Sequence, residues 1–176
     1  MADYYTPTTL EPSIPNRDMT PFERFILTRI YDHEEDGERT YFYSWDGANS
    51  FFWLEKEPLQ ALLRDPAQDP SLIAERVRIA LEAEADHHST DLECTLEEDE
   101  LEDLLQTILK RSETLTHLAI TKAYTCSKMR PGAFGGSITL IRAKGVRFTS
   151  TADMLEDWLS EDEQNDPSKA NPATTA

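Results

Sequence analysis

Residues 125–136 carry the densest set of groups that could bind an anion. Their sequence, TCSKMRPGAFGG, holds a thiol, hydroxyls, two cations and three of the six glycines. Glycines let a backbone curl its N–H groups toward an anion, and lysine and arginine supply positive charge. The candidate ligands for a phosphate or carboxylate are Ser127, Lys128, Arg130, Gly135 and Gly136. Because the spacing matches neither GxGxxG nor the phosphate-binding GxxxxGK pattern, a plain connection between strands is the alternative interpretation.

Catalytic and metal-binding sets do not form recognisable patterns. A nucleophilic Cys126 would need a histidine as general base, and His117 lies about 30 Å away along a straight strand. Residues 86–88 and 91–94 contain ligand types without the spacing of a metal site. Cys94 and Cys126 are therefore expected to be free thiols. We expect no catalytic residue, no metal and no cofactor, and we favour a protein that is not an enzyme.

Acidic residues dominate the chain, which has 34 Asp and Glu against 17 Lys and Arg and a net charge of −17. This charge repels phosphate backbones overall. The densest acidic run is a candidate interaction surface that comprises Glu97, Glu98, Asp99, Glu100, Glu102 and Asp103. Duplex DNA carries about one negative charge per 1.7 Å of axis, so a rigid array of carboxylates can imitate it. The alternative is an ordinary solvated face.

Positive charge is concentrated between residues 110 and 152, where eight Lys and Arg accompany a single acidic residue. That stretch has a formal charge of +7, and the rest of the chain has −24. Arg142, Lys144 and Arg147 complete the candidate interaction surface. These cations either pair with carboxylates of this chain or of another subunit, or bind nucleic acid beside stacking aromatic residues. Given the net charge, we favour an internal partner.

The elements that must position these groups occur in blocks. Capping boxes at Thr20 and Thr95 open helices, and further helices are predicted over residues 58–64, from residue 69 onward and after Ser150. In the last of these, Met154, Leu155, Trp158 and Leu159 are expected to face inward. Strands are predicted at 40–45 and 51–54, as a hairpin, and at 115–126, 137–143 and 146–149, as a meander.

Such blocks predict an α+β fold with an antiparallel sheet of about five strands and helices packed mainly on one face. Residues 1–18 are interpreted as an extended arm, residues 19–160 as one domain and residues 161–176 as a disordered acidic tail. The chain has no apolar run of membrane-spanning length and no secretory signal. We therefore predict a cytoplasmic protein without membrane contact.

Three groups of residues resemble a family of small acidic proteins carried on bacterial plasmids and phages. They are Met1 to Pro7, then Asp18 to Pro21 with Glu23 and Arg24, and finally Thr125 to Pro131 with Phe134, Gly135 and Gly136. The likeness spans nearly the whole chain. It implies an accessory protein of a mobile element, and the family has no known activity to transfer.

Together these features favour a non-enzymatic accessory protein that acts by protein–protein contact, with DNA mimicry against a defence or DNA-processing enzyme as one route. One alternative is an anion- or nucleotide-binding domain, or an enzyme, that uses the 125–136 loop. Another is nucleic-acid binding through the basic strands at 115–149. The partner's identity and the oligomeric state stay open at the level of sequence.

Overall fold

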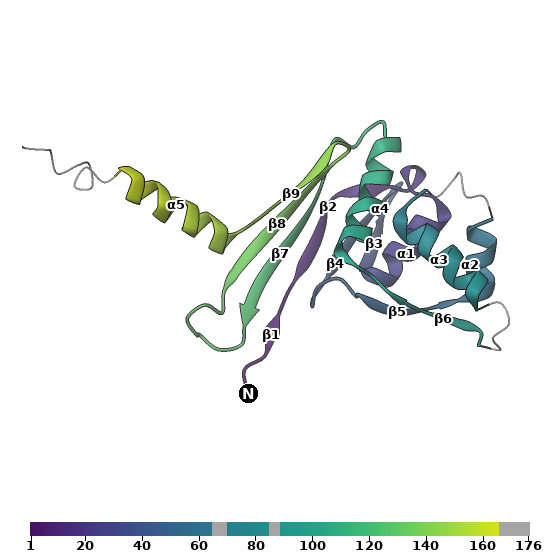
Figure 1. Ribbon diagram of the computed structural model, residues 1–176, viewed down its shortest axis with the longest axis horizontal. Helices are drawn as coiled ribbons and strands as arrows, with labels where there is room; N and C mark the ends of the chain where they lie inside the picture. The colour runs from purple at the N-terminus through teal and green to yellow at the C-terminus, as the bar shows by residue number, and fades with distance from the viewer. Residues whose placement is uncertain (65–69, 85–88, 166–176) are drawn as a thin grey trace, which may run out of the picture.

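The computed structural model describes residues 1–64, 70–84 and 89–165 (Figure 1). Its main sheet comprises β1 (Tyr4–Tyr5), β2 (Thr8–Pro15), β3 (Asp32–Asp36), β4 (Arg39–Ser44), β7 (Leu118–Cys126), β8 (Gly135–Arg142) and β9 (Gly145–Ser150). The strand order is β3-β4-β2-β7-β8-β9, all pairs are antiparallel, and β1 pairs with the end of β7. The α+β class is confirmed, with seven strands in this sheet rather than about five.

All the helices before β7 gather on one side of this sheet (Figure 1). They are α1 (Pro21–Ile30), α2 (Lys56–Leu62), α3 (Leu72–Ala83) and α4 (Glu98–Arg111), with the short 3-10 turn η1 (Asn16–Asp18) before α1. Apolar residues at helical spacing, such as Ile26 in α1 and Leu104 and Ile108 in α4, are fully buried with Leu118 and Ile141 of the sheet. The core therefore lies between α1, α4 and one face of the sheet.

The predicted hairpin between residues 40–45 and 51–54 is not formed. β4 pairs with β2 and β3, whereas β5 (Phe51–Glu55) pairs with β6 (Asp91–Thr95) in a separate two-stranded sheet. Phe52 and Leu54 of β5 are buried together with Leu92 and Cys94 of β6. β6 alternates buried and exposed residues, but its charged residues concealed that pattern in the sequence.

The N-terminal residues include two strands of the sheet, β1 and β2. β2 lies between β4 and β7, and its Leu10 and Ile14 are fully buried. The acidic run that follows α1 is β3, an edge strand whose five residues are all exposed. A polar edge of this kind limits unwanted strand pairing.

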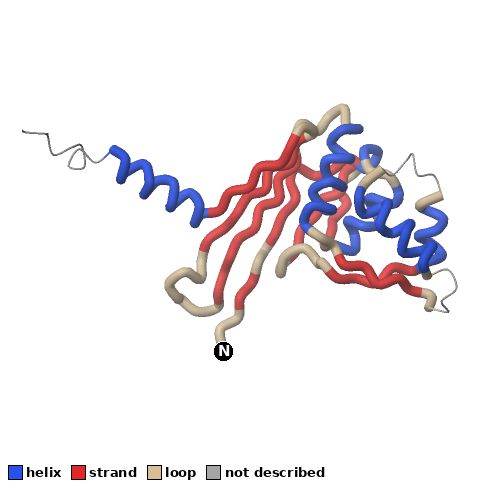
Figure 2. Tube along the Cα trace, in the orientation of Figure 1, coloured by secondary structure: helices blue, strands red, loops and turns tan. Residues whose placement is uncertain are grey.

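The last helix differs most from its prediction. α5 (Thr151–Asn165) extends away from the sheet, and its main contacts are with β8 and β9 beside it (Figures 1 and 2). Met154, Leu155, Trp158 and Leu159 were expected to face inward, yet they are 41%, 54%, 58% and 56% exposed. Among the described residues the contacts of α5 with β8 and β9 leave this stripe largely exposed.

Several predicted boundaries need only small changes. The capping box of α1 is confirmed, because the Glu23 N–H donates to the Thr20 hydroxyl and the Thr20 N–H donates to the Glu23 carboxylate. α4 begins slightly later than predicted, with Glu97 as its cap. The predicted tail begins inside α5, and most of it lies outside the described residues. None of the described helices has both the length and the apolar character that a membrane span requires.

Candidate functional site

The predicted anion-binding residues are spread over two elements. Gly135 and Gly136 belong to β8, while Lys128 and Arg130 are exposed in the loop before it. The Ser127 hydroxyl accepts a hydrogen bond from the Asp3 N–H at 2.9 Å. The Gly136 N–H donates to the Thr151 hydroxyl at 3.3 Å. These contacts engage two of the five groups within the chain, and the use of all five toward one anion stays a prediction.

The two glycines have a packing role that explains their type. A Cβ at Gly136 would lie 2.9 Å from the Lys122 carbonyl oxygen, and one at Gly135 would lie 2.7 Å from the Thr151 hydroxyl. The close approach of β7 therefore requires glycine at position 136, whereas a Cβ at position 135 would displace the Thr151 hydroxyl.

Cys94 and Cys126 are both free thiols. Cys94 is 1% exposed, and burial raises the pKa of its thiol although Arg76 lies 3.8 Å from the sulfur. A protonated buried thiol is a poor nucleophile. Cys126 is half-buried at the end of β7. Among the described residues no three His, Cys, Asp or Glu side chains gather as a metal site, and residues 86–88 lie outside that part of the chain.

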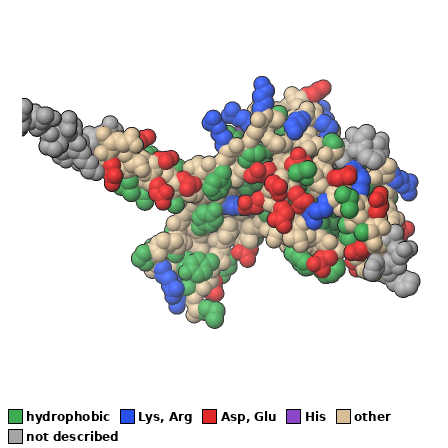
Figure 3. Space-filling view, viewed as in Figure 1, with side chains coloured by type: hydrophobic (Ala, Val, Ile, Leu, Met, Phe, Trp, Pro, Cys, Tyr) green, Lys and Arg blue, Asp and Glu red, His purple; other side chains and the backbone are tan. Residues whose placement is uncertain are grey.

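The predicted acidic surface divides into inward and outward residues. Glu100 is only 7% exposed, because it caps α4 by accepting the Glu97 N–H and also pairs with Arg76. Asp103 accepts the Leu72 N–H at 2.7 Å. These two carboxylates join α4 to α3, and Asp103 is half-buried. The outward residues are Glu97, Glu98, Asp99 and Glu102, at the start of α4 where Figure 3 shows acidic side chains gathered.

An open groove of about 430 Å³ lies between this acidic group and the helix-side face of the sheet. We call it the α4 groove. Its apolar and aromatic lining comprises Tyr31, Ala48, Leu96, Leu101, Ile120 and Phe148. Its acidic rim comprises Asp46, Glu97, Glu98 and Glu102. Lys122 is the single cation in the lining, and its Nζ lies 3.6 Å from a Glu98 carboxylate oxygen.

The rim carries more negative charge than Lys122 offsets. Burial, and then the neighbouring charges of Glu98 and Asp99, raise the pKa of Glu102, while Lys122 acts in the opposite direction. Tyr31 adds a polar group to the lining, since it is 4% exposed and its hydroxyl has no hydrogen-bond partner among the described residues. Burial raises the pKa of Tyr31, so this hydroxyl stays protonated. The groove thus offers an apolar floor beneath an uncompensated acidic rim.

The predicted basic residues lie elsewhere. Arg142, Lys144 and Arg147 are exposed around the turn between β8 and β9, at the end of the sheet where Figure 3 shows basic side chains. None of the three forms an ion pair with another described residue. Lys122 faces the helices, because it pairs with the buried Ser137 in the register of β7 and β8. The cations therefore do not form one stripe along the sheet.

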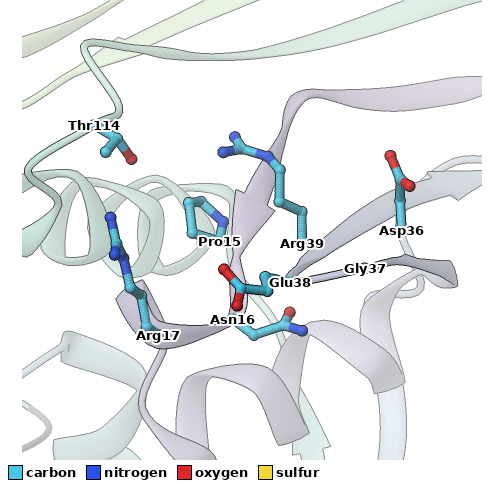
Figure 4. Close-up of a pocket in the computed structure, with 8 residues that line it drawn as sticks. All are labelled: Pro15, Asn16, Arg17, Asp36, Gly37, Glu38, Arg39 and Thr114. Atoms are coloured by element: carbon cyan, nitrogen blue, oxygen red, sulfur yellow. The ribbon is translucent and has the colours of Figure 1, made fainter.

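A second depression, of about 770 Å³, lies where the β3–β4 turn meets η1 (Figure 4). Arg17 and Arg39 line it together with the carboxylates of Asp36 and Glu38. The Arg39 guanidinium donates to the Ser13 carbonyl oxygen, and Arg17 lies 3.8 Å from Asp18. Its charges are mixed and its guanidinium groups already have partners, so the α4 groove is the better-defined candidate.

Sequence reasoning singled out the acidic rim but missed the floor of the α4 groove. Tyr31, Ile120 and Phe148 come from three separate segments, and only the sheet register brings them together. One signal was available, since Phe148 is an aromatic residue between the polar Arg147 and Thr149. Comparison of the chain with protein-family models, with curated proteins and with solved structures finds no match.

Proposed function

We propose that this chain is a non-enzymatic accessory binding protein that acts by protein–protein contact, and that the α4 groove receives a segment of the partner rich in both basic and apolar side chains. The observation that supports this proposal is the acidic rim above an apolar floor. Apolar partner residues would cover Phe148, which is 62% exposed at the side of the otherwise largely buried floor, and Lys or Arg would neutralise the rim. Charge complementarity of this kind favours fast and selective association.

The state of Glu102 supports a basic partner in particular. Its raised pKa reflects burial and the repulsion by Glu98 and Asp99. A cation that enters the rim reduces that repulsion, so its binding is favoured over that of a neutral group.

DNA mimicry is a specific form of this proposal. Proteins that bind DNA present Lys and Arg to its phosphates, and they are therefore suitable partners for an acidic rim. The residues that would imitate phosphates are the outward Glu97, Glu98, Asp99 and Glu102. The resemblance to proteins of plasmids and phages supports a defence or DNA-processing enzyme as the target. Glu100 and Asp103 have no part in this surface, because both serve the helix packing.

The decisive experiment uses a labelled amphipathic peptide with Lys and Arg on one face and Leu and Phe on the other. Fluorescence anisotropy should show saturable binding that weakens as salt increases. The double variant Glu98→Gln with Glu102→Gln should weaken binding by about two- to thirtyfold, since each exposed or partly exposed charge contributes about 0.2–1 kcal/mol. Equal binding of a peptide with Glu in place of its cations would contradict the proposal.

A matched control removes the same charge elsewhere. Glu57 in α2 and Glu82 in α3 are exposed and do not line the groove. The double variant Glu57→Gln with Glu82→Gln should bind the peptide as the native chain does. For the mimicry form, the chain should compete with duplex DNA for a basic nuclease at low salt, and the groove variant should compete poorly. If the control variant loses as much as the groove variant, the effect is one of net charge alone.

A further inference from the structure

We propose that two copies of this chain pair through the free edge of β9, and that each α5 then lies against the basic turn of the other copy. This inference does not rest on the proposed function, although Phe148 belongs both to β9 and to the lining of the α4 groove. It joins three observations, namely an unpaired strand, an uncovered amphipathic helix and a charge segregation between them.

The first observation is the contrast between the two edges of the sheet. β9 bonds to β8 on one side only, so alternate backbone N–H and C=O groups of its six residues face away from every described strand. The other edge, β3, has the sequence DHEED and is protected by charge. β9 has no proline and no acidic residue, and its Phe148 is 62% exposed. It is the edge that can accept another strand.

The second observation is the apolar stripe of α5. Met154, Leu155, Trp158 and Leu159 recur at the spacing of one helix face, and each is between 41% and 58% exposed. The helix follows β9 directly and extends from the sheet (Figure 1). A second copy that pairs with β9 would therefore lie beside the stripe.

The third observation is charge, and it selects a second copy as the occupant. α5 contains Asp153, Glu156, Asp157, Glu161, Asp162 and Glu163 and no Lys or Arg. The turn before β9 carries Arg142 and Lys144, neither of which pairs with a described carboxylate. Antiparallel pairing places the C-terminal end of one β9 beside the N-terminal end of the other. Each acidic α5 is then brought to the basic turn of its partner, and a parallel arrangement would not do this.

The register follows from the faces of the sheet. Val146, Phe148 and Ser150 share the helix-side face, since they pair with Ile141, Thr139 and Ser137 of β8. In a continuous two-fold symmetric sheet these side chains stay on one face only if even-numbered residues of one copy pair with even-numbered residues of the other. With Phe148 on the axis, the two phenyl rings meet and Arg147 faces Thr149 of the other copy. If Arg147 lay on the axis instead, the Arg147 side chains of the two copies would face each other, and like charges directly opposite are unfavourable.

The first measurement is the mass of the full chain in solution, by sedimentation or light scattering across a range of concentrations. We expect a species of twice 20.1 kDa that dissociates on dilution. A monomer at every concentration up to about millimolar would overturn the proposal, since a Kd above that value corresponds to less than about 4 kcal/mol of association free energy.

Charge reversal tests the geometry itself. One variant, Arg142→Glu with Lys144→Glu, has an acidic turn. A second variant replaces Glu156, Asp157, Glu161 and Asp162 by Lys, so that α5 keeps two carboxylates beside four lysines and has a net charge of +2. Each alone should be monomeric, because like charges then meet at both ends of the interface. An equal mixture should form the dimer again, because every contact in the heterodimer joins opposite charges. If either variant dimerises by itself as the native chain does, or if the mixture stays monomeric, the pairing is wrong.

A further pair of variants tests the apolar stripe. Leu159→Asp, on α5, should raise the dissociation constant at least tenfold. Ile79→Asp, at an α3 position with a similar exposed fraction of 58% against 56%, should leave the dimer unchanged. Because both side chains are exposed in a single copy, circular dichroism should show that both variants fold. Equal effects of the two variants would also overturn the proposal.

Discussion

At the scale of single residues, one side chain can take part both in a local capping motif and in a contact with a distant segment. Thr20 and Glu23 form the capping box that their spacing predicts. Glu23 is also fully buried and pairs with Arg111, which lies at the far end of α4 and 88 residues away in the chain. The capping residue is therefore also the buried half of an ion pair whose other half, Arg111, is 36% exposed, and no sequence pattern indicates that partner.

Removing Arg111 should destabilise the fold strongly. Arg111→Ala leaves the Glu23 carboxylate buried without this cation and also removes the hydrogen bond to the Asp18 carbonyl oxygen. The expected loss is about 3–5 kcal/mol in the free energy of unfolding, measured by urea denaturation. Arg24→Ala is the control, because Arg24 and its partner Glu35 are 41% and 45% exposed, and such a surface pair contributes about 0–1 kcal/mol. Similar losses for both variants would mean that the buried pair is not special.

The two thiols should differ in reactivity. Cys94 is buried with a raised pKa, whereas Cys126 is partly exposed. A thiol reagent such as dithionitrobenzoate should therefore modify Cys126 quickly and Cys94 only as the chain unfolds. The variants Cys126→Ser and Cys94→Ser assign the two phases. Rapid modification of Cys94 in the folded chain would show that the packing around β6 is looser than described.

At the scale of elements, the predictions were correct for helices with several turns of periodic apolar residues. They were wrong where the partner of a strand had to be known. α3 and α4 bury the apolar residues that their spacing indicates, including Ile73, Val77, Leu104 and Ile108. The hairpin failed because β5 has its partner in β6, about 40 residues later in the chain. Adjacent strands in sequence pair often but not always, and the alternation of a strand does not name its partner.

The crowded start of α4 leads to a prediction about pH. Burial, Glu98 and Asp99 raise the pKa of Glu102 above its ordinary value of 4.5. A raised pKa means that the folded state holds this proton more tightly than the unfolded state, so the stability from Glu102 is present at acidic pH and is lost as pH rises through the folded pKa. Glu102→Gln should therefore be more stable than the native chain at pH 7, by about 0.2–0.5 kcal/mol for a like-charge pair four residues apart.

The dependence of the unfolding free energy on pH distinguishes relief of repulsion at Glu102 from a general gain in stability. Below the ordinary pKa of glutamate, both proteins carry a neutral side chain at position 102, and the difference in unfolding free energy should disappear. Glu57→Gln, at an exposed position of α2, should show no such profile. A gain for Glu102→Gln that is the same at pH 4 and pH 7 would contradict the assigned cause.

At the scale of the whole molecule, charge segregation is the dominant property. The chain has a net charge of −17, with its cations concentrated in the C-terminal strands and at the end of α4. Net charge of this size opposes compaction through self-repulsion. The α4 groove and the β9 edge differ accordingly, since the first has an acidic rim and the second adjoins a basic turn.

Salt should therefore stabilise the fold. From about 0.01 M to about 1 M sodium chloride the Debye length falls from ~30 Å to ~3 Å, and screening should reduce repulsion more than it weakens the few surface ion pairs. The midpoint of thermal unfolding should rise at pH 7, by about 2–4 °C for each kcal/mol gained. The rise should vanish near the sequence pI of about 4.5, where the net charge approaches zero. A fall in the midpoint at pH 7 would show that attractive pairs outweigh repulsion.

The sequence by itself determined the α+β class, the capped helices, the meander of β7, β8 and β9, and the acidic run at the start of α4. These features depend on neighbours within about one helical turn or one strand, and local spacing records them. Only the tertiary structure decided that β2 joins the sheet, that Glu100 and Asp103 turn inward, that α5 is left uncovered, and that Tyr31, Ile120 and Phe148 line one groove. Each of these depends on contacts between distant segments. A local sequence pattern indicates which element a residue favours, but it does not indicate which distant residues will contact it.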